Sequence, residues 1–374
     1  MNDLEELIRA EIVERGCIPF ARFMEMALYH PQYGYYERAA DQTGRGGDFY
    51  TSVSVGSLFG QLLAAQFAEW VGQLSQPFGS DNTKFQLVEA GTHDGRLALD
   101  ILSWFQQRAP ELLSQLEYWI IEPSTGRRSV QEKTLKTFVP QVRWFSSWSA
   151  MASQSVRGAI FANELLDAFP VHRFGWDAAR QIWFEWGVTW DANGFQWIRV
   201  ADSVRAATSD PRQFVWPEIP QELTAALPDG FTIELGPSAE AWWFQAACAL
   251  GQGKLLTLDY GLDQEAFFAP HRAAGTLRGY HKHRLVSNLL ANVGRQDLTA
   301  PVNFTSLQRA GERAGLLTER LLAQAEFLTR IAEKAWADPS RFGEWPPQMK
   351  RQFQTLIHPE HLGRAFRVLI QSRS

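Results

Sequence analysis

Between residues 85 and 170 the chain alternates short apolar runs with amphipathic stretches, and this order limits its fold more than any other feature. The apolar runs are FQLVEAG, YWIIEPS, VRWFSSW and the start of GAIFANELLDAFP. The stretches RLALDILSWFQQRA and GRRSVQEKTLKTF separate the first three runs and are predicted to be amphipathic helices. Strands that alternate with helices form a parallel sheet with right-handed crossovers. The sequence therefore predicts an α/β fold with a doubly wound sheet.

A glycine-containing turn, Glu89-Ala-Gly91-Thr-His93-Asp-Gly95, joins the first predicted strand to the first helix. Helix N-terminal amides can hold a negative ligand group, and glycines let the backbone approach it closely. Glu122 ends the next strand, where a carboxylate can accept hydrogen bonds from both ribose hydroxyls of a nucleoside cofactor. The G-x-G-x-x-G fingerprint of nicotinamide sites is absent, and Glu89 could meet an ammonium group. Both details favour S-adenosylmethionine; the alternative is a tight turn with a close helix contact.

The alternation stops after Pro170, where aromatic and polar residues alternate around turn signals, as in antiparallel hairpins. Before residue 85 the chain is predicted to be helical apart from one long loop. We divide the chain into a helical extension with a cofactor-covering loop (1–80), a cofactor-binding core (81–170), an inserted β-rich substrate subdomain (171–230), the remaining core (231–335) and a C-terminal helical tail (336–374).

Composition excludes several classes of function. The net charge of −5 gives no electrostatic reason for nucleic acid or an anionic membrane as a partner. No apolar run reaches the roughly 18 residues of a membrane span, and the start of the chain lacks signal-peptide features. Cys17 and Cys248 are the two cysteines and fit a reducing compartment, so we expect a soluble, cytoplasmic protein. His281 and His283 have no clear third ligand nearby, so no metal site is expected.

Several sequence motifs between about residue 17 and about residue 330 occur in the order that one protein family shares. They are FMEMALYHPQYGYY, GRGGDFYTS with SLFGQLLA, FANELLDAFPV, LLTLDYG, GTLRGY and DLTAPVNFTSL. Together they resemble the MidA-like family, and the number of ordered motifs makes the resemblance specific. The resemblance implies a Rossmann-like class I methyltransferase sheet with a helical N-terminal extension and an inserted, aromatic-rich antiparallel subdomain. It also implies S-adenosyl-L-methionine as methyl donor and, by similarity to mitochondrial members, arginine on a protein as acceptor.

The chain departs from the family pattern at two places. The middle glycine of the usual E-L-G-P-G-R-G turn is replaced by His93, whose side chain could crowd the methionine moiety or donate a hydrogen bond to its carboxylate. The usual T-A-H-V-D-F reads Thr299-Ala-Pro301-Val-Asn303-Phe. These departures motivate a second hypothesis from another class, a catalytically silent binding or assembly-chaperone protein.

Two acids follow the fourth predicted strand, at the sheet edge where α/β proteins bind ligands. Glu164 and Asp167, as positions i and i+3 of a starting helix, would share one side and could orient a guanidinium. Alternatively, they only stabilise the positive end of the helix dipole. Asn163 could cap that helix or contact the cofactor.

The long N-terminal loop is the third candidate part of the site. We expect Gly46–Thr51 to fold over the cofactor, with Asp48 and Thr51 as polar contacts. Alternatively, Thr51 caps the next helix. Trp148 could contact adenine or belong to the core, and Asp259 could line the cleft or cap a turn.

Overall fold

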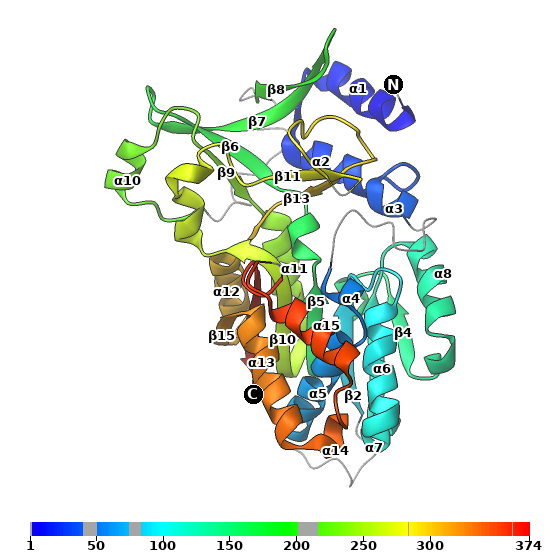
Figure 1. Cartoon of the computed structure of the whole chain (residues 1–374). Coiled ribbons are helices and arrows are strands. Elements are labelled where there is room, and N and C mark those ends of the chain that lie inside the picture. The colour runs from blue at the N-terminus through cyan, green and yellow to red at the C-terminus, as the bar shows by residue number, and fades with distance from the viewer. Residues whose placement is uncertain (1, 40–50, 75–83, 201–215, 283, 361) are drawn as a thin grey trace. The chain divides into compact units, whose positions relative to one another are not determined.

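The computed structural model describes residues 2–39, 51–74, 84–200, 216–282, 284–360 and 362–374 (Figure 1). The chain divides into two compact units of three segments each. Unit 1 comprises Met1–Phe49, Leu166–Ala241 and Gly261–Leu307. Unit 2 comprises Tyr50–Leu165, Trp242–Tyr260 and Gln308–Ser374. Asp48 lies outside the described residues, so its predicted contact with the cofactor stays a prediction.

Unit 2 is organised around a mixed sheet with the strand order β15-β16-β10-β5-β2-β3-β4. The strands are β2 (Phe85–Ala90), β3 (Leu116–Ile121), β4 (Val142–Phe145), β5 (Val156–Asn163), β10 (Leu250–Leu262), β15 (Leu317–Ala323) and β16 (Phe366–Arg373). Strands β10, β5, β2, β3 and β4 are parallel, whereas β16 runs antiparallel to both of its neighbours. The predicted parallel sheet with four successive strands is therefore confirmed.

The helices that belong wholly to unit 2 are α4 (Ser52–Val55), α5 (Leu58–Gly72), α6 (Arg96–Arg108), α7 (Pro110–Gln115), α8 (Thr125–Thr134), α13 (Gln324–Ala337), α14 (Pro339–Phe342) and α15 (Pro347–Ile357). Apolar faces of α5, α6, α13 and α15 bury the main core against the sheet. Gly60 lets α5 approach α6 closely, because a Cβ there would lie 2.6 Å from Cβ of Asp100. No helix in the described part of the chain is long and apolar enough to span a bilayer.

Unit 1 contains the predicted antiparallel hairpins. Its larger sheet has the order β1-β7-β6-β9, with β8 also paired to β7. These strands are β1 (Ile18–Pro19), β6 (His172–Asp177), β7 (Ile182–Asp191), β8 (Gly194–Arg199) and β9 (Thr232–Leu235). A smaller sheet joins β11 (Arg278–His281), β12 (Arg284–Val286) and β13 (Asp297–Thr299). The helices are α1 (Asp3–Arg15), α2 (Phe20–Tyr29), α3 (Tyr35–Ala39) and α10 (Gln221–Ala226). Strand β14 (Val302–Asn303) also belongs to unit 1, whereas α11 (Pro237–Ala249), α12 (Phe304–Arg313) and the end of β10 have residues in both units.

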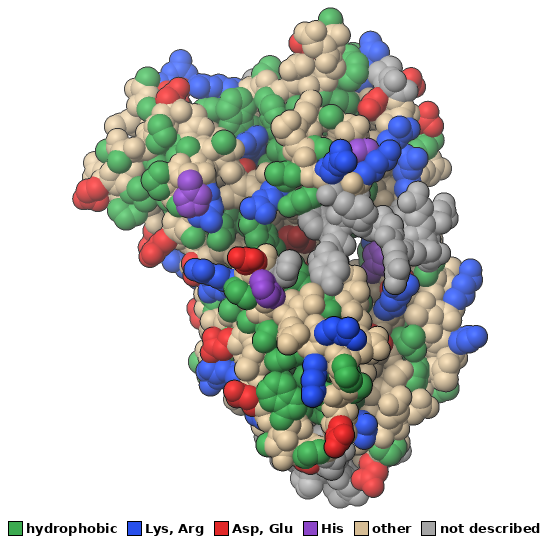
Figure 2. Space-filling model, viewed as in Figure 1, with side chains coloured by type: hydrophobic (Ala, Val, Ile, Leu, Met, Phe, Trp, Pro, Cys, Tyr) green, Lys and Arg blue, Asp and Glu red, His purple; other side chains and the backbone are tan. Residues whose placement is uncertain are grey.

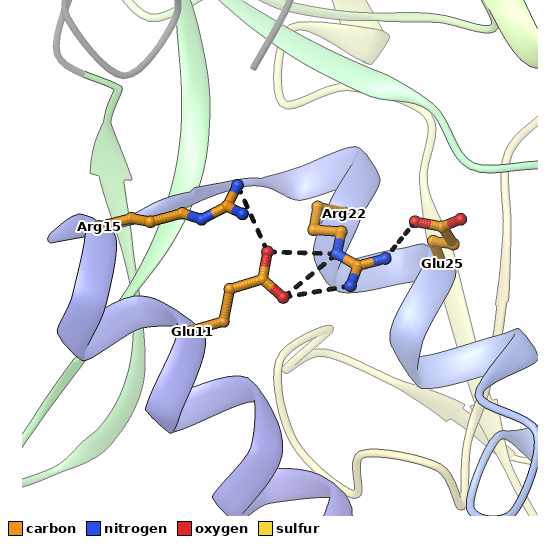
Figure 3. A network of polar contacts seen from close by, with 4 residues as sticks. All are labelled: Glu11, Arg15, Arg22 and Glu25. Carbon is orange, nitrogen blue, oxygen red and sulfur yellow. Dashed lines mark hydrogen bonds and ion pairs between the residues drawn. The ribbon is translucent and has the colours of Figure 1, made fainter. Parts of the chain in front are cut away.

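Helices α1 and α2 are joined by the polar network of Figure 3. Nη1 of Arg22 lies 2.7 Å from Oε2 of Glu25, and its Nη2 lies 3.2 Å from Oε2 of Glu11. Because the side chains of Arg22 and Glu25 are 43% and 53% exposed, water weakens the attraction and the network adds little stability. Helix α1 ends at Arg15 and is followed by its C-cap Gly16, which has a φ of 81°.

Candidate functional site

The glycine turn after β2 depends on two glycines. Gly91 and Gly95 have φ values of 74° and 87°, in the left-handed region that favours glycine. A Cβ at Gly91 would lie 2.9 Å from Cδ1 of Leu165, and one at Gly95 would lie 3.4 Å from Cβ of Thr134. Both positions therefore favour glycine because of their backbone conformation, and Gly91 also lacks room for a Cβ against Leu165.

His93, the residue that replaces the family's middle glycine, does not fill the turn. Its φ is 48°, and its side chain is 68% exposed with Nδ1 3.9 Å from Oδ1 of Asp94. The part of His93 that faces inward is its carbonyl oxygen, which accepts a hydrogen bond of 3.0 Å from Nε2 of Gln131. The exposed imidazole therefore does not pack into the turn, and its predicted cofactor contact stays a prediction.

Glu89 is buried inside unit 2, near the end of β2. Its Oε2 accepts a hydrogen bond from the hydroxyl of Tyr118, and its side chain is almost wholly excluded from water. Burial raises the pKa of Glu89 to about 8, because water cannot stabilise the charged form. At neutral pH the group is therefore mostly protonated. The predicted contact of Glu89 with an ammonium group stays a prediction, and a bound cation would lower its pKa.

Glu122 follows β3 at the carboxyl edge of the sheet, where the sequence places it. Its side chain is almost fully buried and is held by three groups on or just before α8. The amide of Ser124 donates to Oε1 at 2.9 Å, Nε2 of Gln131 donates to Oε2 at 2.9 Å, and Nε of Arg127 lies 3.3 Å from Oε1. A carboxylate has about four lone-pair positions, so these contacts leave capacity for a ligand hydroxyl.

Gln131 is a site residue that sequence reasoning missed. Its Nε2 donates both to Glu122 and to the carbonyl of His93, so it joins the two halves of the predicted cofactor site. Nε1 of Trp144 in turn donates to Oε1 of Gln131 at 3.0 Å. No sequence signal marks a glutamine within an amphipathic helix; its complete burial in the folded chain does.

The prediction that an α-helix begins at Glu164 is wrong. Glu164 has a φ of 51°, which a right-handed helix cannot accommodate, and only a three-residue 3-10 helix, Leu166–Ala168, follows it. The positions i and i+3 of a starting α-helix therefore do not describe Glu164 and Asp167. Glu164 belongs to unit 2 and Asp167 to unit 1, so each is described within its own unit.

Glu164 is surrounded by polar groups from three segments of unit 2. Its Oε1 accepts hydrogen bonds from the amide of Ser52 at 2.9 Å and from Nδ2 of Asn163 at 3.2 Å. Burial and the negative charge of Asp259 raise the pKa of Glu164 to about 7, against the opposing effect of the two hydrogen bonds. Its neighbouring acid in this unit is thus Asp259, which lies within β10, the strand that pairs with β5, in the sequence motif LLTLDYG.

Thr51 caps helix α4. Its Oγ1 accepts a hydrogen bond of 3.2 Å from the amide of Ser54, in a reciprocal capping box. The capping alternative is therefore confirmed, and a cofactor contact of Thr51 stays a prediction. Sequence reasoning missed Ser52, whose amide contacts Glu164 and whose hydroxyl donates to Oε1 of Gln324 at 3.2 Å.

Two buried polar atoms near this edge have no hydrogen-bond partner within the described ranges. They are Oγ1 of Thr92, in the glycine turn, and Oδ1 of Asn163, at the end of the adjacent strand β5. Buried polar atoms in folded proteins nearly always bond to protein, water or a ligand. Together with the glycine turn and Glu122, these two atoms fit a cofactor that carries hydroxyl, amino and carboxylate groups.

Trp148 is buried against Trp242, with ring centroids 5.3 Å apart.

In unit 1, the segment that departs from the family pattern has a clear structural role. Asn303 caps helix α12, because its Oδ1 accepts a hydrogen bond of 3.2 Å from the amide of Ser306. The carbonyl of Asp167 accepts from the amide of Ala300 at 2.8 Å, and the buried Asp297 accepts from the hydroxyl of Tyr36 at 2.9 Å. Asparagine and aspartate cap helices equally well, so this substitution keeps the local fold.

Metal and surface features add two observations. Within the residues that the structure describes, no cluster of three or more His, Cys, Asp or Glu could hold a metal ion. His281 uses Nδ1 to contact the carbonyl of Arg295 at 2.7 Å, whereas His283 lies outside the described residues. Acidic and basic side chains both occur across the face drawn in Figure 2.

Comparisons with known proteins agree on one family. The family model described as "Putative S-adenosyl-L-methionine-dependent methyltransferase" matches residues 62–321. Among curated proteins, the chain is similar to "Protein arginine methyltransferase NDUFAF7, mitochondrial" of Rattus norvegicus, with 28% identity over 95% of this chain and 81% of the relative. The Homo sapiens protein of the same name is 29% identical over 95% of this chain and 80% of the relative.

A solved structure extends this likeness to three dimensions. A crystal structure of a Burkholderia thailandensis protein bound to S-adenosyl-homocysteine is 29% identical, covers 99% of this chain and 92% of its own, and superposes with a TM-score of 0.77. The names of the curated relatives also contradict one expectation. Because the rat and human proteins are named as mitochondrial, the expectation of a cytoplasmic location is wrong.

Proposed function

We propose that this chain, which belongs to the family of S-adenosyl-L-methionine-dependent methyltransferases, methylates an arginine side chain of a protein substrate. The methyl donor is S-adenosyl-L-methionine, and the chain is an enzyme of that class. The names of the rat and human relatives support arginine as the acceptor. The observation that carries the proposal is the position of Glu164, a carboxyl group with a pKa of about 7 just beyond the carboxyl end of β5.

The cofactor supplies a methyl group that its sulfonium already activates, so the protein needs chiefly to position the reacting groups. Glu122 would accept the ribose hydroxyls, because its carboxylate is oriented by Ser124 and Gln131. Gly91 and Gly95 would leave the backbone free to approach the amino-acid part of the cofactor. Oγ1 of Thr92 and the side-chain oxygen Oδ1 of Asn163 would form their missing hydrogen bonds with the cofactor.

Glu164 would bind the acceptor guanidinium. Arginine arrives charged, with a pKa above about 12, and its planar donors suit a carboxylate. Oε1 of Glu164 is already fixed by Ser52 and Asn163, which leaves Oε2 for an incoming N–H. A carboxylate in this place orients the nitrogen and offsets charge as the proton leaves. The role predicted for Asp167, that of a second carboxylate for the acceptor, stays a prediction.

The departures at His93, Pro301 and Asn303 motivated the hypothesis of a catalytically silent binding protein, and those at His93 and Asn303 are compatible with catalysis. The side chain of His93 is exposed, and Asn303 keeps a helix cap. Neither residue disturbs the contacts of Glu122 or Glu164. The structure thus provides no observation that favours the silent alternative.

The test is quantitative mass spectrometry of methylarginine peptides from cells with the wild-type protein, with Glu164→Gln and without the protein. We expect peptides that lose methylation equally in the last two. Calorimetry with S-adenosylhomocysteine is the control for folding, because Glu164→Gln should bind it with nearly unchanged affinity. Normal arginine methylation in Glu164→Gln cells would remove Glu164 from the mechanism, and methylation that appears only on another residue type would remove arginine as the acceptor.

A further inference from the structure

Strand β5 ends at Asn163, whereas its partner β10 continues to Leu262, and Glu164 lies where their pairing stops. Asn163 pairs with Leu258, and the amide of Glu164 donates the next hydrogen bond to the carbonyl of Leu258 at 2.9 Å. The following amide, that of Leu165, does not continue to the strand backbone. It donates instead to Oδ2 of Asp259 at 3.2 Å, so the Asp259 side chain continues the pairing beyond the ladder.

The backbone at Glu164 needs such support. A φ of 51° is unfavourable for a residue with a Cβ and persists only where the surroundings hold it. The bond to Leu258 holds the chain at Glu164, and the bond to Asp259 holds it at Leu165. The second oxygen of Asp259 accepts from the amide of Tyr260 at 2.8 Å, which fixes the orientation of the carboxylate. Two consecutive residues of β10 thus hold the turn at Glu164 and Leu165.

Asp259 also determines the electrostatic surroundings of Glu164. Its side chain is completely buried, and two backbone amides stabilise negative charge on it. Burial raises the pKa of Glu164 most, and the charge of Asp259 raises it further. The other polar groups that face Glu164 are the amide of Ser52, from α4, and the side-chain amide of Asn163, from β5. Both are neutral donors, so Asp259 is the charged neighbour that acts on Glu164 within the described part of unit 2.

We propose that Asp259 is a positioning residue for Glu164: by accepting the hydrogen bond of the Leu165 amide, it fixes the turn that presents the Glu164 carboxyl. This inference rests on the proposed function of Glu164 as the group that receives the acceptor. Asp259 itself does not touch the substrate in this arrangement. Its contribution is a fixed backbone and a carboxyl that exchanges its proton near neutral pH.

The test is a titration of Glu164 by NMR in protein labelled with ¹³C at the glutamate carboxyl groups. Glu164→Gln assigns the signal, because only that signal disappears. In the wild type we expect a midpoint near pH 7, and in Asp259→Asn a midpoint lower by about one unit, since the neighbouring charge is removed. Asp229→Asn is the matched control, because Asp229 also accepts a backbone amide, that of Ala178, but on the exposed edge of unit 1.

A midpoint in Asp259→Asn that stays at the wild-type pH or rises would overturn the proposal. In Asp259→Asn, the side-chain NH₂ replaces one of the two accepting oxygens and faces a backbone N–H, so two donors meet and the variant could fail to fold. Hydrogen exchange in the wild-type protein covers that case: the amide of Leu165 should be protected like that of Glu164, and unprotected exchange would contradict the positioning role.

Turnover separates this inference from the proposed function. With radiolabelled donor and proteins from cells that lack this enzyme as acceptors, the acid limb of the wild-type pH profile should lie near pH 7. In Asp259→Asn the limb should move to lower pH and kcat should fall, whereas a merely structural role would lower kcat without moving the limb. Full turnover in Glu164→Gln would remove the proposed function, yet the NMR midpoints would still decide whether Asp259 acts on Glu164.

Discussion

Nε2 of Gln131 donates hydrogen bonds to Oε2 of Glu122 at 2.9 Å and to the carbonyl of His93 at 3.0 Å. One buried amide thereby holds together the carboxylate predicted to bind ribose and the turn predicted to bind the amino-acid part of the cofactor. The two elements come from different strand ends, β3 and β2. Their relative position therefore depends on a side chain that lies on a third element, α8.

Replacement of Gln131 by alanine should weaken cofactor binding. The variant loses the bonds to Glu122 and His93, and each buried hydrogen bond contributes about 1 kcal/mol, so Kd for S-adenosylhomocysteine should rise about tenfold or more. Isothermal calorimetry measures this directly. Gln107→Ala is the control, because Gln107 is an exposed glutamine on α6. Equal affinities for the two variants would show that Gln131 does not organise the site.

Replacement of Gly91 by alanine should destabilise the protein and impair cofactor binding together. The alanine would have to adopt a φ of 74°, and its Cβ would lie 2.9 Å from Cδ1 of Leu165. We therefore expect the free energy of unfolding to fall by about 1–3 kcal/mol. Gly72→Ala is the matched change, because Gly72 ends α5 and a Cβ there meets no atom within 4 Å. Urea denaturation of both variants decides the prediction, and a Gly91→Ala protein as stable as Gly72→Ala would refute it.

Glu89 should make the protein less stable as the pH rises. Its pKa is about 8 in the folded protein and about 4.5 without the burial, so the folded state binds the extra proton between these values. Stability then falls as the pH rises from about 4.5 to about 8, because the unfolded state releases its proton more readily. Glu89→Gln cannot ionise and should lose this part of the dependence. Its melting temperature relative to wild type should increase from pH 5 to pH 8; a constant difference would contradict the buried, protonated carboxyl.

Asn303 should tolerate the family's aspartate but not alanine. Its Oδ1 caps helix α12 through the amide of Ser306, and loss of such a cap costs about 1 kcal/mol. We expect Asn303→Ala to lower the free energy of unfolding by about that amount, while Asn303→Asp stays near the wild type. Chemical denaturation compares the three proteins. If the alanine variant retains full stability, the cap contributes nothing, and the departure from the family pattern has no explanation in this contact.

The sequence was sufficient for the parallel core and for the places of Gly91, Gly95 and Glu122. Each of these rests on a local signal: an apolar run long enough for a strand, a glycine where the backbone turns, or an acid directly after a strand. Hydrophobic burial and backbone sterics act over a few neighbouring residues, so such signals survive in the linear order. The antiparallel hairpins after Pro170 are confirmed for the same reason.

Only the tertiary structure decided how Glu164 is held. Its contact with Ser52 joins positions 112 residues apart, and the contact of Leu165 with Asp259 joins positions 94 residues apart. The local pattern of acids predicted a helix through Glu164 and Asp167, but the ladder bond to Leu258 and the Asp259 carboxylate favour a left-handed turn at Glu164 instead. A helical propensity of a few tenths of a kcal/mol per residue cannot compete with hydrogen bonds that form when distant strands meet.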